Sequence, residues 1–161
     1  RNTGGNNDID PLDSSTSGHL LLSILGLFTI ETQIQFSPAY QFQSAGMLIW
    51  QDGHNFLRFE RAYWTKSQNG ILFQKAENGD FLDVTALGQH PTTASVIDLR
   101  VERNGDHFTG SWREPGKDWQ IDGETDIHFY GSMMVGLDLL NEYNTPSTTA
   151  YFTYFRVSSC T

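Results

Sequence analysis

Hydrophobic and polar residues alternate in several short runs along the chain. In the run 28–36, four apolar side chains would share one face of an extended strand: Phe28, Ile30, Ile34 and Phe36. The run 97–102 places apolar residues at odd positions and charged residues at even positions. A period of two is typical of strands with one buried and one wetter face. The pattern therefore predicts an all-β protein without a long helix.

Glycine-containing pairs separate the apolar runs and predict hairpin turns. They are Asp52-Gly53, Asn69-Gly70, Asn78-Gly79, Asn104-Gly105, Pro115-Gly116 and Asp122-Gly123. Asn-Gly and Asp-Gly supply the positive φ that tight hairpins require. Short β-rich runs with turns at this spacing predict a sandwich or barrel. The expected core comprises Ile30, Ile34, Met47, Ile49, Leu57, Phe59, Leu99, Val101, Leu137, Phe152 and Tyr154, with Trp112 and Trp119 also packed inside.

The chain of 161 residues has the length of one domain. Residues 1–18 are polar and predict a linker or a loosely ordered segment, so we expect a single β-sandwich domain over residues 19–161. The sequence starts at Arg1 without a signal peptide, and we expect it to be one domain of a longer protein. The longest apolar run, 20–30, is too short to span a membrane, so no membrane insertion is expected.

Composition and charge narrow the possible partners. Aromatic residues are frequent (Trp 4, Tyr 6, Phe 11) and only 18% of residues are charged, which favours strands. A net charge of -9 repels phosphate backbones, so we expect no nucleic-acid partner. The charge suits a secreted or cell-surface protein with a neutral partner. The single cysteine, Cys160, allows no internal disulfide and no thiolate zinc site.

Three stretches of the sequence resemble the concanavalin A-like lectin/glucanase superfamily. They are residues 28–38, an early strand ending at a proline; residues 45–61, a hairpin with an Asp-Gly turn; and residues 135–137 with 149–157, two closing strands. The stretches are most similar to a bacterial laminin-G-type branch, which includes the C-terminal domain of β-xylosidases and uncharacterised secreted modules. The resemblance implies a jelly-roll β-sandwich of two antiparallel sheets over residues 18–157. It leaves function open, because this fold hosts hydrolases, lectins and adhesion modules.

The sequence offers little support for catalysis. Glycosidases need two carboxylates that flank the scissile bond, and hydrolases of this superfamily carry them as Glu-x-Asp-x-x-Glu, a string that is absent here. The nearest acidic alternation, Asp122, Glu124 and Asp126, follows a tryptophan and is interpreted as a solvated loop. Glu60 and Glu102 stand beside arginines and are interpreted as ion-paired acids. We predict no catalytic residues.

Metal ligation has only one weak candidate. The five histidines, His19, His54, His90, His107 and His128, show no zinc-type spacing. The alternating acids Asp8, Asp10 and Asp13 could supply oxygen ligands to a structural calcium ion. A disordered acidic linker is the alternative interpretation. No other cofactor is expected.

The hairpin between positions 50 and 64 combines aromatic and planar polar side chains, as a sugar site requires. The predicted ligand-binding residues are Trp50, Arg58, Glu60, Tyr63 and Trp64. A three-residue turn would pair Trp50 with Phe56 and place it beside Arg58, whereas a two-residue turn would bury it with Leu57. An ion pair between Arg58 and Glu60 on a solvated sheet is the alternative. The polar residues 141–144 could line a ligand rim or form an ordinary surface loop.

The sequence therefore predicts a non-catalytic, carbohydrate-binding type of module from a larger secreted bacterial protein. Its expected partners are a glycan and other domains of the parent protein. One alternative is a structural or protein-interaction accessory domain that packs on a catalytic domain. Another is a glycoside hydrolase with an unrecognised carboxylate pair.

Overall fold

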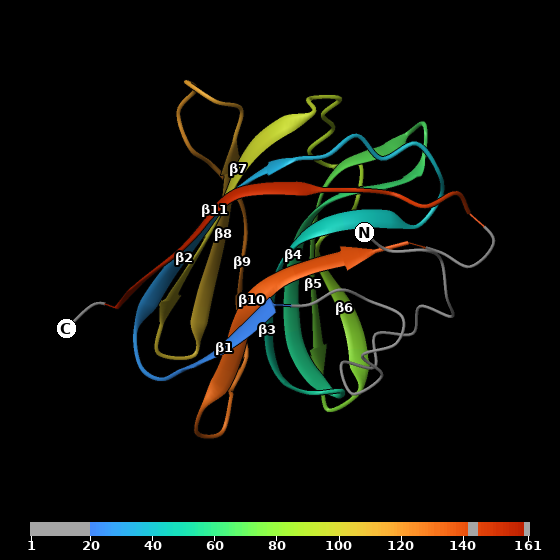
Figure 1. Cartoon of the computed structure of the whole chain (residues 1–161). Helices are drawn as coiled ribbons and strands as arrows, with labels where there is room; N and C mark the ends of the chain where they lie inside the picture. Colours follow the sequence, from blue (N-terminus) through green and yellow to red (C-terminus); the bar gives the residue numbers. More distant parts are fainter. Residues whose placement is uncertain (1–19, 142–144, 160–161) are drawn as a thin grey trace.

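Two antiparallel β-sheets lie face to face in the computed structural model (Figure 1). The structure describes residues 20–141 and 145–159. The strands are β1 (Leu20–Ile24), β2 (Phe28–Gln35), β3 (Gln43–Asp52), β4 (Asn55–Thr65), β5 (Gln68–Glu77), β6 (Asp80–Thr85), β7 (Val96–Asn104), β8 (His107–Arg113), β9 (Gln120–Asp126), β10 (Met133–Leu140) and β11 (Tyr151–Ser159). Within the described residues, no helix is long and apolar enough to cross a membrane.

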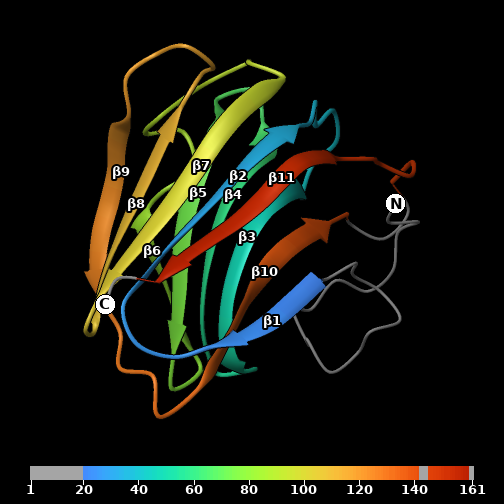
Figure 2. The same ribbon diagram turned by 60° about the vertical axis from the view of Figure 1, so that its left-hand side comes forward.

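The strand order identifies the sandwich as a jelly roll, which confirms the predicted fold class. One sheet has six strands in the order β1-β10-β3-β4-β5-β6, and the other has five in the order β11-β2-β7-β8-β9. Neighbouring strands in each sheet are antiparallel, and the chain passes repeatedly between the sheets (Figure 2). Strands distant in sequence thus become neighbours, such as β3 and β10.

Apolar side chains from the inner faces of both sheets form the core. Met47, Phe59 and Phe73 are opposite one another on three adjacent strands, and the rings of Phe59 and Phe73 are 5.1 Å apart. The opposing sheet accommodates these rings at Gly110, where a Cβ atom would lie 3.0 Å from the Phe73 ring. Eight of the predicted core residues are fully buried: Ile30, Ile34, Met47, Ile49, Leu57, Phe59, Leu99 and Val101. Their burial agrees with the predicted period of two.

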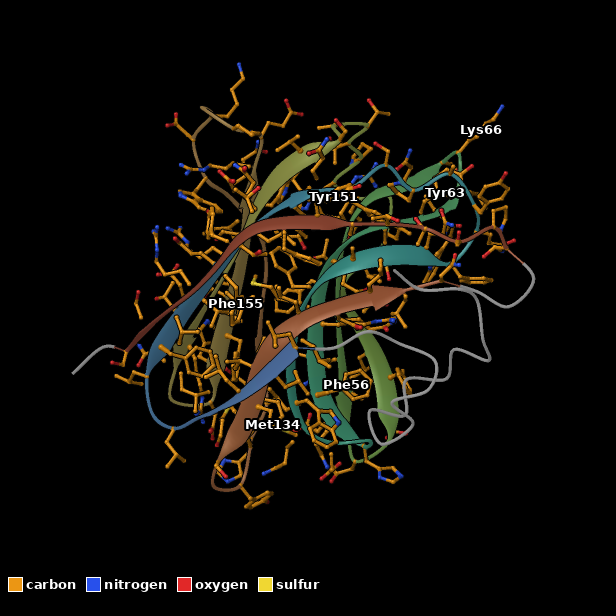
Figure 3. The ribbon with its side chains drawn as sticks, in the orientation of Figure 1. Phe56, Tyr63, Lys66, Met134, Tyr151 and Phe155 are labelled. Carbon is orange, nitrogen blue, oxygen red and sulfur yellow. The ribbon has the colours of Figure 1, made fainter. Side chains whose placement is uncertain are left out.

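A β-bulge in β11 changes the expected orientation of the last strand. Phe152 pairs with Ile34 but Tyr154 pairs with Gln33, so the register shifts between them. Phe155, labelled in Figure 3, then packs against the core, as does Phe152. The guanidinium of Arg156 lies 5.3 Å from the Tyr154 ring. The prediction that Tyr154 belongs to the core is therefore wrong, because the bulge reverses the alternation.

Two further core predictions need correction. Trp112 is buried in the core as expected. Trp119 is only half-buried, and the guanidinium carbons of Arg100 and Arg113 each lie 4.3 Å from the centre of its ring. Trp119 therefore stacks with cations instead of joining the core. Leu137 is also half-buried.

The hairpin between β3 and β4 combines a two-residue turn with a bulge. Asp52 pairs with Asn55 across the turn, and its carboxylate accepts hydrogen bonds from the His54 backbone N–H (2.8 Å) and the Asn55 side chain (3.0 Å). The bulge between Trp50 and Asp52 restores the pairing of Trp50 with Phe56. Trp50 therefore lies on the outer face of the six-stranded sheet, as a three-residue turn would also have placed it.

Candidate functional site

A line of polar side chains crosses the outer face of the six-stranded sheet. Gln74 donates from Nε2 to Asp83 Oδ1 (2.8 Å) and accepts at Oε1 from Arg58 Nε (2.8 Å). Arg58 Nε also lies 3.8 Å from Glu60 Oε2. These side chains share a face because Asp83, Gln74 and Arg58 are directly opposite one another on β6, β5 and β4. Glu60 follows Arg58 by two residues on β4 and therefore points to the same side. The line places planar donors and acceptors in one row.

The row continues across Gly46 to a second acid. Gly46 pairs with Glu60 on one side and with Asp138 on the other. A Cβ atom at position 46 would lie 2.2 Å from the Phe59 carbonyl oxygen and 3.0 Å from Glu60 Cγ, so only glycine leaves room for the Glu60 side chain. The Glu60 and Asp138 side chains interact across this gap. The two carboxyl groups can therefore share a proton.

Burial raises the pKa of Glu60 from 4.5 to about 7. The positive charge of Arg58 opposes this rise, and the negative charge of Asp138 adds to it. Glu60 also interacts with the Ser44 side chain, which favours the charged form. Near neutral pH, Glu60 is therefore present in both protonation states.

The outer face presents little of the predicted sugar site to solvent. The relative exposure of Trp50 is 7%, that of the Arg58 side chain is 13%, and that of the Glu60 side chain is 0%. Trp64 packs with an apolar cluster on this face and contacts the ring of Phe42 (5.7 Å). Tyr63 is on the opposite side of β4, near the end of the strand (Figure 3). The five predicted residues do not form one open surface, and their ligand-binding role stays a prediction.

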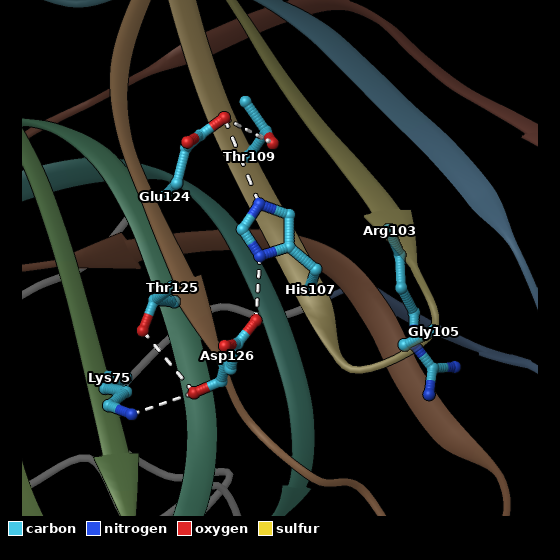
Figure 4. A network of polar contacts seen from close by, with 8 residues as sticks. All are labelled: Lys75, Arg103, Gly105, His107, Thr109, Glu124, Thr125 and Asp126. Atoms are coloured by element: carbon cyan, nitrogen blue, oxygen red, sulfur yellow. Dashed lines mark hydrogen bonds and ion pairs between the residues drawn. The ribbon is translucent and has the colours of Figure 1, made fainter.

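The acids of the run 122–126 lie on a strand instead of the expected solvated loop. Asp122 is buried, and His90 Nδ1 lies 2.6 Å from its carboxylate. Its pKa is raised by burial, an effect that the hydrogen bond with His90 opposes. Each acid of the run has a histidine partner, because His107 lies between Glu124 (3.9 Å) and Asp126 (2.7 Å) in Figure 4.

The contacts of Figure 4 lie both within the five-stranded sheet and between the two sheets. Lys75 on β5 donates to the Asp126 backbone carbonyl at 2.9 Å, and Thr109 on β8 bonds to Glu124 on β9 at 3.4 Å. Arg103 bonds to the Gly105 carbonyl within its own hairpin. In the described part of the chain, no three His, Cys, Asp or Glu side chains are grouped to hold a metal ion. The calcium candidates Asp8, Asp10 and Asp13 lie outside the described residues.

An accessible hollow lies at one end of the sandwich, and we name it the rim hollow. It has a volume of about 330 Å³ and is lined by Gln35, Phe36, Ser37, Ala39, Tyr40, Gln43, Ser147, Thr148, Thr149 and Tyr151. Tyr40 is 48% exposed and Tyr151 is 65% exposed. Figure 3 shows Tyr151 at the end of the sandwich that also carries Tyr63 and Lys66. The rim hollow thus combines two accessible aromatic rings with neutral polar groups.

Buried amides connect the two loops that form the rim hollow. Gln43 Oε1 accepts hydrogen bonds from the backbone N–H groups of Ala39 (2.9 Å) and Tyr40 (3.1 Å). Gln43 Nε2 donates to Asn141 Oδ1 (2.9 Å), and Asn141 Nδ2 donates to the Pro146 carbonyl (3.2 Å). Gln43 and Asn141 are both buried. These hydrogen bonds hold the loop before β3 against the segment that leads to β11.

The pairing of β2 with β11 places an amide beside an aromatic ring. Gln35 and Tyr151 are directly opposite each other in this pair, so their side chains are neighbours on the same face. A tyrosine ring offers an apolar surface to a sugar, and an amide both donates and accepts hydrogen bonds. Sequence reasoning missed this site, because Tyr151 is far along the chain from Gln35 and Tyr40. The exposed tyrosines beside loops rich in Ser, Thr and Pro were the available signal.

The fold and these surfaces define a concanavalin A-like, lectin-type β-sandwich. Residues 27–158 match the family described as the β-xylosidase C-terminal concanavalin A-like domain, and the chain belongs to this family. The family is a non-catalytic type of module at the C-terminus of GH43 enzymes, which agrees with the prediction from the sequence. No curated protein sequence matches the chain.

Solved structures support the same fold. Xylan β-1,4-xylosidase from Bacillus halodurans is 18% identical with a TM-score of 0.70, and the match covers 83% of this chain and 28% of the xylosidase. The carbohydrate-binding module CBM66 from Bacillus subtilis is 17% identical with a TM-score of 0.59, and the match covers 99% of this chain and 92% of the module. Lectin I-B4 from Griffonia simplicifolia is 12% identical with a TM-score of 0.67, and the match covers 91% of this chain and 81% of the lectin. The chain thus spans less than a third of the xylosidase.

Proposed function

We propose that this chain is a non-catalytic carbohydrate-binding module of a larger bacterial protein that is secreted or displayed at the cell surface. The observation that carries the proposal is the rim hollow, where the exposed rings of Tyr40 and Tyr151 stand among amide and hydroxyl groups. Sugars need such a combination, because one side of a pyranose is apolar and its edge carries hydroxyl groups.

The similar structures support this proposal at the level of the class. A carbohydrate-binding module and a lectin share the fold, and the xylosidase carries it as a minor part of a longer chain. A module of this kind would keep a parent enzyme close to its polysaccharide. The glycan and the other domains of the parent protein are the proposed partners.

The size and construction of the rim hollow predict modest affinity. A volume of about 330 Å³ is at the small end of ligand sites, so a short stretch of glycan would fill it. Each exchanged hydrogen bond contributes only about 0.5–1.5 kcal/mol net. We expect dissociation constants on the order of micromolar to millimolar, or about 4–8 kcal/mol. The buried hydrogen bond between Gln43 and Asn141 limits the entropy that the loops lose on binding, because it holds both loops in place before the ligand arrives.

A glycan array followed by titration calorimetry tests the proposal. Tyr151→Ala and Tyr40→Ala should each weaken binding of the selected glycan by at least about fivefold, since each removes a stacking surface of about 1 kcal/mol or more. Tyr130→Ala is the matched control, because Tyr130 is a 77% exposed tyrosine that does not line the rim hollow. This control should bind like the unmodified chain.

Backbone amide shifts distinguish the rim hollow from the predicted hairpin site. Binding at the rim hollow should shift the amides of residues 35–43 and 147–151. If the shifts instead cluster at Trp50, Arg58 and Glu60, the hairpin is the site. If no glycan of the array binds and no amide shifts, the proposed function is wrong.

An exposed leucine edge favours a second candidate function, a contact with a neighbouring domain. Leu20 and Leu22 on the edge strand β1 are 65% and 43% exposed, and Leu25 and Leu27 after it are 64% and 40% exposed. An edge strand with apolar side chains is a common docking element. Hydrogen exchange at β1 should be slower in the full-length parent protein than in the isolated domain. Equal exchange rates would exclude this contact.

A further inference from the structure

Among the residues that the structure describes, the lining of the rim hollow carries no charged side chain. Its polar groups are the amides of Gln35 and Gln43 and the hydroxyls of tyrosine, serine and threonine residues. The other two described hollows differ, since Glu102, Arg103 and Glu124 line one of them, and Lys66 and Glu114 line the other. The uncharged lining therefore distinguishes the rim hollow from these two other hollows.

A neutral lining discriminates against charged ligands. A carboxylate or sulfate that enters the hollow loses part of its hydration, and no lysine or arginine in the lining compensates for this loss. The protein as a whole has a net charge of -9, which adds a long-range repulsion toward anions at low ionic strength. A neutral sugar avoids both penalties and can still form hydrogen bonds with the exposed Gln35 amide and with the hydroxyl groups of the lining.

We infer that the rim hollow selects neutral glycans and rejects glycans that carry uronic acid or sulfate groups at the bound position. This inference rests on the proposed function and adds the chemical class of the ligand. The cross-strand pair of Gln35 and Tyr151 supplies recognition without charge, because the ring covers the apolar side of a sugar and the amide meets its hydroxyls.

The test compares two ligands that differ in charge. A neutral xylo-oligosaccharide and an oligosaccharide of equal length built from uronic acids are titrated into the unmodified chain at low salt. We expect the neutral ligand to bind at least about tenfold more tightly, a difference that corresponds to 1.4 kcal/mol. High salt should reduce the ratio of the two affinities, because it screens the long-range repulsion between the negatively charged protein and the uronic ligand.

A lysine placed in the lining should change this preference. Thr149 is exposed and lines the rim hollow, so Thr149→Lys should improve binding of the uronic ligand by at least about threefold. Ser132→Lys adds the same charge at an exposed position outside the lining and serves as the matched control. The control separates a change inside the hollow from a change in net charge.

The outcomes separate the inference from the proposed function. The inference is supported if the neutral ligand binds more tightly than the uronic ligand, and if Thr149→Lys reduces this preference whereas Ser132→Lys does not. Equal affinity for both ligands, with the loss of binding in Tyr151→Ala retained, overturns the inference and leaves the proposed function intact. Absence of binding by either ligand and by every glycan of the array overturns the proposed function itself.

Discussion

Replacing Glu60 by glutamine should remove a large part of the pH dependence of folding stability. Glu60 is fully buried on the outer face of the six-stranded sheet, and its pKa is raised from 4.5 to about 7. The folded state therefore binds the Glu60 proton more tightly than the unfolded state. Its contribution is fully present below about pH 4.5 and is lost as the pH rises through 7.

The magnitude follows from the size of the pKa change. A rise from 4.5 to about 7, at about 1.4 kcal/mol per pH unit, gives a loss of about 3 kcal/mol between acidic and slightly alkaline pH. The groups that face Glu60 act in both directions: Arg58 and Ser44 favour the carboxylate, and Asp138 opposes it. Glutamine keeps the shape of the side chain and cannot ionise, so Glu60→Gln should be more stable than the unmodified chain above pH 7.

Urea unfolding at several pH values between about 4 and 8 measures this effect. The midpoint of the unmodified chain should fall as the pH rises, and that of Glu60→Gln should fall much less. Glu102→Gln is the control, because Glu102 is an exposed acid that also has an arginine partner, Arg100 at 3.5 Å. If Glu60→Gln and Glu102→Gln both follow the pH profile of the unmodified chain, Glu60 does not hold a proton in the folded state and the reasoning is wrong.

In the same urea denaturation assay, Gly46→Ala should destabilise the fold by about 1–3 kcal/mol or more, because its Cβ would lie 2.2 Å from the Phe59 carbonyl oxygen. Gly53→Ala is the control and should leave the stability unchanged, because its Cβ would meet no atom within 4 Å. Phe59→Ala should lower the free energy of unfolding by about 3–5 kcal/mol, since the ring is fully buried between the sheets; an unchanged denaturant midpoint would contradict this. Incubation with β-glucan, xylan, arabinan or levan should release no reducing sugar; turnover that Glu60→Gln or Glu124→Gln abolishes would refute this prediction and identify a hydrolase.

The faces of most strands could be predicted from the sequence. Leu57 and Phe59 alternate with Arg58 and Glu60, and the structure buries the first pair between the sheets and places the second pair on the outer face. Such alternation is a local property, because successive side chains of a strand point to opposite sides. The resemblance to concanavalin A-like domains over most of the chain added the arrangement of the strands in a jelly roll, which the family match confirms.

Bulges set the limit of this local reasoning. One extra residue reverses every later side chain of a strand, as in β11, where Phe155 takes the core position that the alternation assigned to Tyr154. The bulge before Asp52 determines the face of Trp50 in the same way. Neither bulge has a residue signature in this sequence, because each depends on how the strand fits its partner.

The candidate sites depended still more on the tertiary structure. The sequence determined most of the strands, most of their faces and the absence of a recognised catalytic motif. Only the folded chain brings Gln43 to Asn141, which are 98 positions apart, and so joins two loops into the rim hollow. Only the pairing of β3 with both β4 and β10 brings Glu60 to Asp138 across Gly46, where loss of water raises the pKa of Glu60. Contacts of this range follow from the path of the whole chain, whereas local alternation records only which side of a strand is buried.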